Sequence, residues 1–458
     1  MIRIALLLVL VITGALSVFA QNPIIKGTYN ADPTARVFNG RVYLFPSHDI
    51  PPATPELQAR KWFCMGDYHV YSSDDMVHWT DHGVILDQKD VPWGQPDAYS
   101  MWAPDCVTKD GKYYFYFPDA PKAKEGERPR GFGIGVAVAD KPEGPYKPAE
   151  EPVKGAFGID PCVLMDNDGS AYIFWSGMGQ RVAKLKDNMC EVDGEAIAID
   201  GGFPRGNGLK EGPFAFRRAD KYYFTFPWVR DSTELLAYAM SDKPMGPYEF
   251  KGIIMDASAT GCWTNHHSIV EFNGQWYLFY HHNDYSPDFD KNRSTRIDSL
   301  SFNADGTIRK VKATLRGVGI SKANEQIQID RYSYIEGPVV EYINRQEPFL
   351  GWYTDFKWQG DYVKYNAVDF AKGYKKVNIR YRANNAVVVL VRTAKGEKIA
   401  ELNMPQADDW SEITLDASDS VKGVQDIVVE LRADVKQPKG FGAKNDGSLK
   451  IDWLSFGN

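Results

Sequence analysis

The chain lacks several features that mark whole classes of protein. After residue 20 it has no apolar run of roughly 20 residues, the length that a membrane-spanning helix requires. It has no block of basic residues, and its formal net charge is −7. Nucleic acids and anionic membranes attract basic surfaces, so the sequence predicts neither as a partner. The oligomeric state is left open.

Cysteine is scarce as well. The five cysteines are scattered along the chain, and none belongs to a Cys-x-x-Cys pair. Such a set argues against a cysteine metal site and against a fold held by a disulfide framework, although a single disulfide stays compatible with it. We expect most of these thiols to be buried as small apolar groups.

The one long apolar run stands at the N-terminus. Residues 1–20 combine Arg3, an apolar stretch and Val18-Phe19-Ala20 in front of Gln21. This pattern predicts a secretory signal peptide with its cleavage site. We therefore expect the mature protein to be secreted or periplasmic, with enough chain for two domains.

Helical periodicity is rare, and one β pattern replaces it. A strand, a turn resembling Asn-Gly or Asp-Gly, and a second strand rich in Tyr and Phe occur together five times, and a weaker hairpin follows each copy. The five copies cover residues 35–45, 106–117, 162–175, 214–226 and 269–280. Two hairpins make a four-stranded sheet, so the repeats predict an all-β chain with a five-bladed β-propeller. A β-sandwich would not explain paired hairpins that recur five times.

The residues at the start of the five first strands carry the chemistry. They are Asp32, Ala103, Asp160, Glu211 and His266. The innermost strands of a propeller run along its axis, so equivalent positions converge at one end of the channel. Burying several carboxylates together is costly, and such gatherings occur where pKa values are tuned for a reaction. The pattern therefore predicts a functional site on the axis.

Two carboxyl groups across a pocket suit glycoside cleavage, in which one protonates the leaving oxygen and the other activates water or attacks the sugar. Glu211 is the better candidate for the acid, since it has the longer side chain and Phe214 and Phe216 follow it in the sequence. Either Asp32 or Asp160 would be the base. Blades that face each other across a channel favour the wide separation, roughly 6.5–9.5 Å, that gives inversion.

Taken together, these motifs resemble glycoside hydrolase family 43, whose members are five-bladed propellers. The resemblance covers about residues 22–320 and depends on NADPTARVFNGRVYLF, MWAPDC, GIDPCV, LKEGPF and NHHSI. It implies an inverting reaction with Asp32 as general base, Asp160 as modulator of the acid's pKa, and Glu211 as general acid. It also implies a calcium ion or water cluster on the axis near His266.

Further residues are predicted to bind substrate. The resemblance suggests Arg293 and His266, and Trp102 could form a wall on which a sugar ring stacks. Two segments outside the repeat, residues 51–69 and 86–100, are expected to shape the pocket. Their candidates for contact are Trp62, His69, Trp93 and Tyr99. Phe214 completes the predicted substrate-binding set.

The last third of the chain has a different pattern. We divide the protein into a signal peptide (1–20), a propeller (21–322) and a β-sandwich of jelly-roll type (323–458), the last because of its many short alternating strands. This sandwich resembles a family 6 carbohydrate-binding module, with Lys450 where that family commonly has Asn. Trp352, Tyr353 and Trp358 are candidates for ring stacking, and a purely structural domain is the alternative.

The sequence predicts an exo-acting, inverting glycosidase on side chains of plant-type glycans. An α-L-arabinofuranosidase is the first choice and a β-xylosidase the close rival, while exo-galactanase or galactofuranosidase activity is a further alternative. The expected partner is thus a glycan that contains arabinose or xylose. Outside enzymes, the alternative is a propeller that binds glycans without cleaving them.

Overall fold

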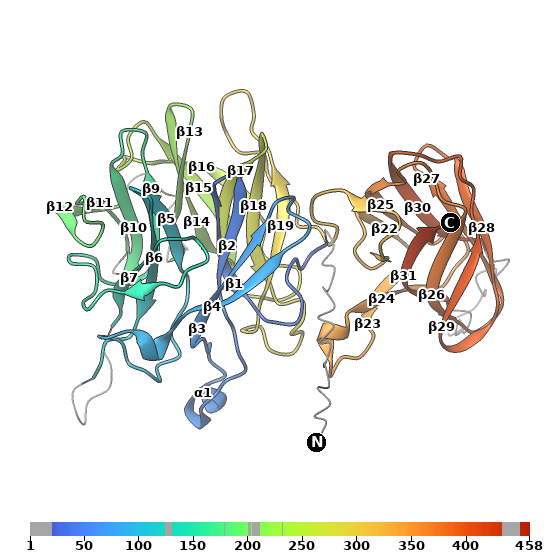
Figure 1. Ribbon diagram of the computed structural model, residues 1–458, viewed down its shortest axis with the longest axis horizontal. Helices are drawn as coiled ribbons and strands as arrows, with labels where there is room; N and C mark the ends of the chain where they lie inside the picture. Colours follow the sequence, from blue (N-terminus) through green and yellow to red (C-terminus); the bar gives the residue numbers. More distant parts are fainter. Residues whose placement is uncertain are drawn as a thin grey trace, which may run out of the picture.

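The computed structural model describes residues 21–123, 131–177, 179–199, 203, 211–230, 232–432 and 449–458. The predicted signal peptide lies outside these residues. The described chain is almost entirely β and forms two bodies side by side (Figure 1). Its helical elements are α1 (Pro55–Arg60), η1 (Gln88–Asp90) and η2 (Pro348–Leu350). None of the described helices is long and apolar enough to cross a membrane.

Five antiparallel sheets, each made of consecutive strands, form the first body and confirm the predicted repetition. Blade one contains β1 (Ala31–Phe38), β2 (Arg41–Ser47), β3 (Asp67–Ser73) and β4 (Thr80–Asp87). Blade two contains β5 (Asp105–Lys109), β6 (Lys112–Asp119), β7 (Gly133–Ala139) and β8 (Lys147–Pro148). Blade three contains β9 (Ile159–Met165), β10 (Ala171–Gly177), β11 (Gly179–Leu185) and β12 (Val192–Ala198). Blade four contains β13 (Phe214–Arg218), β14 (Lys221–Arg230), β15 (Thr233–Ser241) and β16 (Glu249–Met255). Blade five contains β17 (His267–Phe272), β18 (Gln275–His282) and β19 (Ser294–Leu300).

Blade five departs from the predicted four strands, since its described sheet has three. The segment before β1 runs along its outer strand instead. The backbone N–H of Ile24 donates to the carbonyl of Thr295 at 3.0 Å, and that of Asn30 donates to the carbonyl of Arg293 at 2.8 Å. The beginning of the propeller thereby joins its end, which closes the ring and leaves fewer sheet edges open.

Two packed sheets form the second body and confirm the predicted β-sandwich. One sheet has the order β20 (Ser321–Lys322), β25 (Tyr362–Asp369), β30 (Val424–Leu431), β27 (Val387–Thr393) and β28 (Lys398–Met404), with β22 (Tyr334–Glu336) beside β25. The other has the order β23 (Val339–Tyr342), β24 (Trp352–Phe356), β31 (Leu449–Gly457), β26 (Lys376–Ala383) and β29 (Ala407–Asp416), with β21 (Ile327–Gln328) beside β31. Every second residue of β26 is buried, as a half-exposed strand requires.

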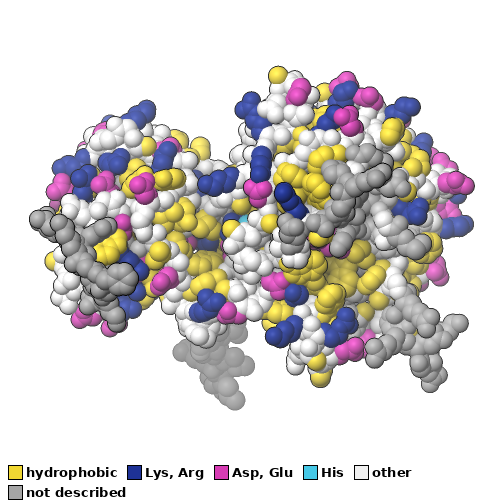
Figure 2. All heavy atoms as spheres, turned by 180° about the vertical axis from the view of Figure 1, so that it is seen from behind, with side chains coloured by type: hydrophobic (Ala, Val, Ile, Leu, Met, Phe, Trp, Pro, Cys, Tyr) yellow, Lys and Arg dark blue, Asp and Glu magenta, His cyan; other side chains and the backbone are white. Residues whose placement is uncertain are grey.

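The sandwich is docked against the propeller through a buried arginine. The Arg331 guanidinium donates to the carbonyl of Asn22 at 2.5 Å and lies 4.2 Å above the ring of Trp352. Trp352 also packs against Tyr285 of the propeller, with ring centroids 5.0 Å apart. Trp352, a predicted sugar-stacking residue, is therefore part of the domain interface. On the face of the molecule in Figure 2, acidic and basic side chains are interspersed over both bodies.

Candidate active site

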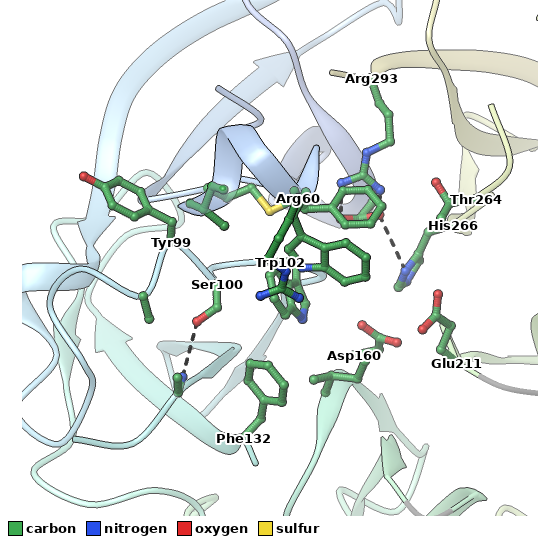
Figure 3. Close-up of a pocket in the computed structure, with 18 of the residues that line it drawn as sticks. Arg60, Tyr99, Ser100, Trp102, Phe132, Asp160, Glu211, Thr264, His266 and Arg293 are labelled. Atoms are coloured by element: carbon green, nitrogen blue, oxygen red, sulfur yellow. Dashed lines mark hydrogen bonds and ion pairs between the residues drawn. The ribbon is translucent and has the colours of Figure 1, made fainter. Parts of the chain in front are cut away.

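A cavity of about 860 Å³ in the propeller collects the predicted site residues. Asp32, Asp160, Glu211, His266 and Arg293 all line it. In Figure 3 the carboxyl groups of Asp160 and Glu211 and the imidazole of His266 point into one shared space. Residues from four blades and from the loop before β19 thus meet at one point, as the repeat alignment predicted.

In blades one to four, the start of the inner strand has an unusual backbone. Asp32, Ala103 and Asp160 have φ angles of 47°, 39° and 55°, and Gly212 has 68°. Each of these residues precedes a proline. The left-handed region favours glycine and tolerates aspartate better than bulky residues. In blade four, Gly212 is therefore the residue equivalent to Asp32 and Asp160, whereas the sequence alignment assigned that position to Glu211. The side chain of Glu211 reaches the cavity from the residue just before it.

Asp32 is held as a carboxylate. Its Oδ1 accepts from Nη1 of Arg293 at 3.0 Å, and its Oδ2 accepts from the Ser47 hydroxyl at 2.7 Å. Its backbone N–H donates to Nδ1 of His281 at 3.1 Å. Burial alone would raise the pKa of Asp32, but the charge of Arg293 and the hydrogen bond from Ser47 hold it well below the usual range. Asp32 is consequently ionised and suited to accept a proton.

Arg293 is itself fixed by a second buried aspartate. Its Nε donates to Oδ2 of Asp49 at 2.9 Å, its Nη2 donates to Oδ1 at 2.9 Å, and its side chain is 4% exposed. The guanidinium also lies 4.8 Å above the ring of Phe63. We predicted Arg293 as a substrate contact; in the structure it lines the cavity and is bound to Asp32 and Asp49. Asp49 was missed, because it lies outside the repeated positions.

The other carboxyl groups of the cavity differ from Asp32, because their surroundings favour the protonated form. Burial and the neighbouring charge of Glu211 raise the pKa of Asp160 well above its ordinary value, although the N–H of Gly212 donates to Oδ2 of Asp160 at 2.8 Å. Glu234 lines the same cavity, and burial together with Glu211 raises its pKa to about 8. Three carboxyl groups that share a buried site cannot all be ionised at neutral pH. This side therefore retains at least one proton.

Glu234 was not predicted from the sequence. It lies at the start of β15, is 2% exposed, and its Oε2 accepts from the N–H of Asn265 at 2.9 Å. The available signal was an acidic residue directly in front of the apolar stretch Leu235–Ala239. No repeat position draws attention to it.

His266 lines the cavity with its Nδ1 3.8 Å from Oδ1 of Asp32. Burial lowers the pKa of His266 more than the charge of Asp32 raises it, so the imidazole is neutral near pH 7. Calcium takes about six to eight oxygen ligands. The groups described around His266 do not fit that shell, because Asp32 is already bound by Arg293, and Asp105 is paired with Arg36 at 2.6 Å. The protein groups near His266 would therefore supply few of these ligands, and water would have to complete the shell of the predicted calcium ion.

Aromatic side chains form the cavity walls. Trp102 lines it, as predicted, and packs against Phe132 with ring centroids 5.3 Å apart. From the segments outside the repeat come Trp62 and Tyr99, with α1 at one end of the propeller (Figure 1). These segments thus add walls beside the acids, as expected.

Three predicted substrate contacts, His69, Trp93 and Phe214, do not line the cavity, and His69 instead lies with its Nδ1 3.2 Å from Oδ1 of Asp81. Trp93 packs against Phe117 at a centroid distance of 6.3 Å, with the ring planes 13° apart. Phe214 is 1% exposed and lies beneath the guanidinium of Arg36, 4.8 Å from its ring centroid. The side chains of Trp93 and Phe214 contribute to packing, and the structure does not support the prediction that they bind substrate.

Comparison with known proteins agrees with this site. Residues 20–308 match glycosyl hydrolases family 43. The chain belongs to this family. A xylosidase/arabinosidase 43A of Humicola insolens is 38% identical over 335 residues, which cover 62% of this chain and 98% of that protein. Family 43 membership makes the protein a glycoside hydrolase that acts on glycans.

Two solved family 43 structures show how far the similarity extends. A beta-xylosidase/alpha-arabinofuranosidase from a compost microbial metagenome, in complex with xylotriose and described as a calcium-free form, is 37% identical with a TM-score of 0.58. The similarity covers 64% of this chain and 98% of that one. An arabinoxylan arabinofuranohydrolase from Bacillus subtilis, in complex with cellotetraose, is 25% identical with a TM-score of 0.54, and the similarity covers 97% and 100% of the two chains. The second structure therefore matches both bodies.

Proposed function

We propose that the protein is an exo-acting, inverting glycosidase that releases α-L-arabinofuranosyl groups from arabinoxylan-type glycans. The observation that carries this proposal is the electrostatic asymmetry of the cavity. Asp32 is held ionised by Arg293, whereas Asp160, Glu211 and Glu234 form a group that retains a proton. A base and an acid that face one substrate site are what inverting hydrolysis requires.

In this mechanism, Asp32 removes a proton from a water molecule while the oxygen of that water attacks the anomeric carbon. Glu211 gives its proton to the glycosidic oxygen while the bond from that oxygen to the anomeric carbon breaks. The products are an alcohol and a sugar of inverted configuration. Asp160 modulates the acid through its charge, since its carboxyl group and that of Glu211 affect each other's protonation.

The substrate class is supported by the extent of similarity. The Bacillus subtilis protein matches this chain over both bodies and is named an arabinoxylan arabinofuranohydrolase. A β-xylosidase is the second candidate, because the Humicola insolens relative, with higher identity over the propeller, is named a xylosidase/arabinosidase. Residues of α1 and of the segment 95–102 line the same cavity as the acids, so they would contact the sugar bound there.

We also propose that the protein is exported and that its sandwich has a mainly structural role. Residues 1–20 have the pattern of a signal peptide. The sandwich is docked through Arg331 and Trp352, and the ammonium group of Lys450 lies 4.7 Å above the ring of Tyr353. That face of Tyr353 is therefore covered, which disfavours stacking of a sugar there.

Hydrolysis of nitrophenyl α-L-arabinofuranoside, β-D-xyloside and galactosides, followed by proton NMR of the first sugar anomer released, tests the activity. We expect the arabinofuranoside to be the best substrate and the product to be inverted. A retained anomer would rule out the role of Asp32 as a base that activates water. Preference for the xyloside would favour the second candidate.

The role of Glu211 has a separate test. For Glu211→Gln we expect kcat/KM on arabinoxylan to fall by about 10²–10⁴-fold, since proton donation to a poor leaving group is lost. The loss should be much smaller on a dinitrophenyl arabinofuranoside, whose leaving group needs no proton. Glu191→Gln, at a surface glutamate paired with Lys186, is the matched control. Equal losses on both substrates would contradict the assignment.

A further inference from the structure

A second cluster of ligand-type side chains lies on the other side of the strand segment that holds the catalytic base. The residues Ser47, His48 and Asp49 follow one another at the end of β2. Ser47 donates to Asp32, and Asp49 binds Arg293. Because successive side chains of an extended segment point to opposite sides, His48 is directed away from the cavity.

His48 meets two residues of β3 on that side. Ser47 is paired with Tyr68 across the two strands, so His48 lies beside Asp67. Tyr68 is buried, whereas Asp67 and His69 flank it and point to the opposite face of β3. The ligand atoms of His48, Asp67 and His69 lie within 4.8 Å of one another. None of the three residues lines the catalytic cavity.

The distances within this cluster suit a small cation. Nδ1 of His48 is 2.7 Å from Oδ1 of Asp67, and Nε2 of His69 is 3.9 Å from the same oxygen. Ligands of a tetrahedral ion with bonds of about 2.0–2.1 Å are separated by roughly 3.3 Å. The 2.7 Å distance from His48 to Asp67 would have to widen slightly, and the 3.9 Å distance from His69 to Asp67 would have to shorten slightly, to reach this value. The side chains are 15–25% exposed, so an ion can enter from solvent.

The orientation of His69 is fixed by a residue outside the cluster. Nδ1 of His69 is 3.2 Å from Oδ1 of Asp81, which lies on the neighbouring strand β4. Its ring also stacks on Tyr71, with centroids 6.0 Å apart. Metal-binding histidines commonly use one ring nitrogen for a carboxylate and the other for the ion. Asp81 thus leaves Nε2 of His69 as the free ligand atom.

We propose that His48, Asp67 and His69 form a binding site for a divalent transition-metal ion such as Zn²⁺. Two imidazoles and one carboxylate are ligands that zinc prefers, and water would complete the tetrahedron. Calcium, which prefers oxygen, is a poor match for this set. The ion would connect β2 to β3 and fix the segment from which Ser47 and Asp49 reach the catalytic base and its arginine.

Titration calorimetry of untagged full-length protein with ZnCl₂, after dialysis against EDTA, tests this proposal. We expect one equivalent to bind and the thermal midpoint of unfolding to rise as zinc is added. His48→Gln and His69→Gln should abolish the calorimetric signal. Asp81→Asn should weaken binding by about 10–100-fold, because only the orientation of His69 is lost.

His78→Gln is the matched control, since His78 forms an ordinary surface pair with Asp75 in the same blade at 2.7 Å. It should bind zinc as the wild type does. The proposal is overturned if the wild type binds no zinc, or if His69→Gln and His78→Gln bind it equally. Should the cluster variants fail to fold by circular dichroism, Co²⁺ absorption of the wild type decides: intense visible bands of a low-coordinate histidine site support the proposal, and their absence refutes it.

Discussion

Blade one and blade three place an aspartate at the same position and give it opposite chemistry. Asp32 and Asp160 both precede proline, both have left-handed backbones with φ of 47° and 55°, and each is 4% exposed. Burial favours the neutral form of both, but only Asp32 has a guanidinium beside it, while Asp160 faces Glu211. The repeat position thus decides where a carboxyl group lies, and its neighbours decide whether it is charged.

The largest effect that separates the two blades is expected for Asp32→Asn. The amide cannot accept a proton from water, so kcat/KM should fall by about 10²–10⁴-fold at every pH. The measurement is the pH profile on a nitrophenyl arabinofuranoside. Asp140→Asn, at a surface aspartate paired with Lys112, serves as control. Activity of Asp32→Asn within a few-fold of the wild type would remove Asp32 from the mechanism.

Arg293→Met should make Asp32 resemble Asp160. Without the guanidinium, burial raises the pKa of Asp32, so the acid limb of kcat/KM should move to higher pH. Removing one partner of a buried ion pair also costs about 3–5 kcal/mol of folding free energy, because Asp32 and Asp49 lose their shared cation. Urea unfolding and the pH profile measure the two effects.

Arg293→Lys is the informative control for this change. Lysine keeps the charge but cannot reproduce the fork that binds both aspartates. We therefore expect the acid limb to return part of the way toward that of the wild type. An acid limb that stays in place in Arg293→Met would show that other groups keep Asp32 ionised.

Repetition explains how much of this architecture could be predicted from sequence. The turns after the first strands recur with Asn39, Asp110 and Asn273 in left-handed conformations, and such turns follow from local residue preferences. Counting back from the turn at Asn39 led to Asp32, and counting back from the turn at Asp168-Gly169 led to Asp160. It misplaced Glu211 by one residue, because the alignment did not recognise that Gly212 supplies the left-handed position.

Residues outside the repeat could not be found in this way. Asp49 and Glu234 reach the site from a loop and from a third strand, and only tertiary packing brings them to Arg293 and Glu211. Trp93 and Phe214 were misjudged for a related reason. Most strand aromatics are buried in a core, and which of them faces a cavity depends on how neighbouring blades pack.

Asp160→Asn should sharpen the comparison from the other blade. It removes a potential negative charge from the carboxyl group that Glu211 and Glu234 share, so the remaining groups hold their proton less tightly. We expect the alkaline limb of kcat/KM to move down by about one pH unit, with a larger loss at pH 8 than at pH 5. A loss that is equal at all pH values would assign Asp160 to positioning of substrate instead of modulation of the acid.

The smallest effect on activity is expected for Glu234→Gln. Its effect on stability should be a gain, whereas Arg293→Met should cause a loss. The pKa of Glu234 is raised from 4.5 to about 8 in the folded protein. Below pH 4.5 the folded and unfolded chains both carry this proton, so the side chain costs nothing. As the pH rises from 4.5 to 8, only the folded chain still holds the proton, and the stability of the fold falls.

Glutamine is neutral throughout and its oxygen can still accept from Asn265. Thermal and urea unfolding should therefore show Glu234→Gln to be more stable than the wild type at pH 8, by on the order of 1–3 kcal/mol, and little changed at pH 4.5. Its alkaline limb should shift by less than that of Asp160→Asn, and a stability gain that is independent of pH would show that packing, not charge, is responsible.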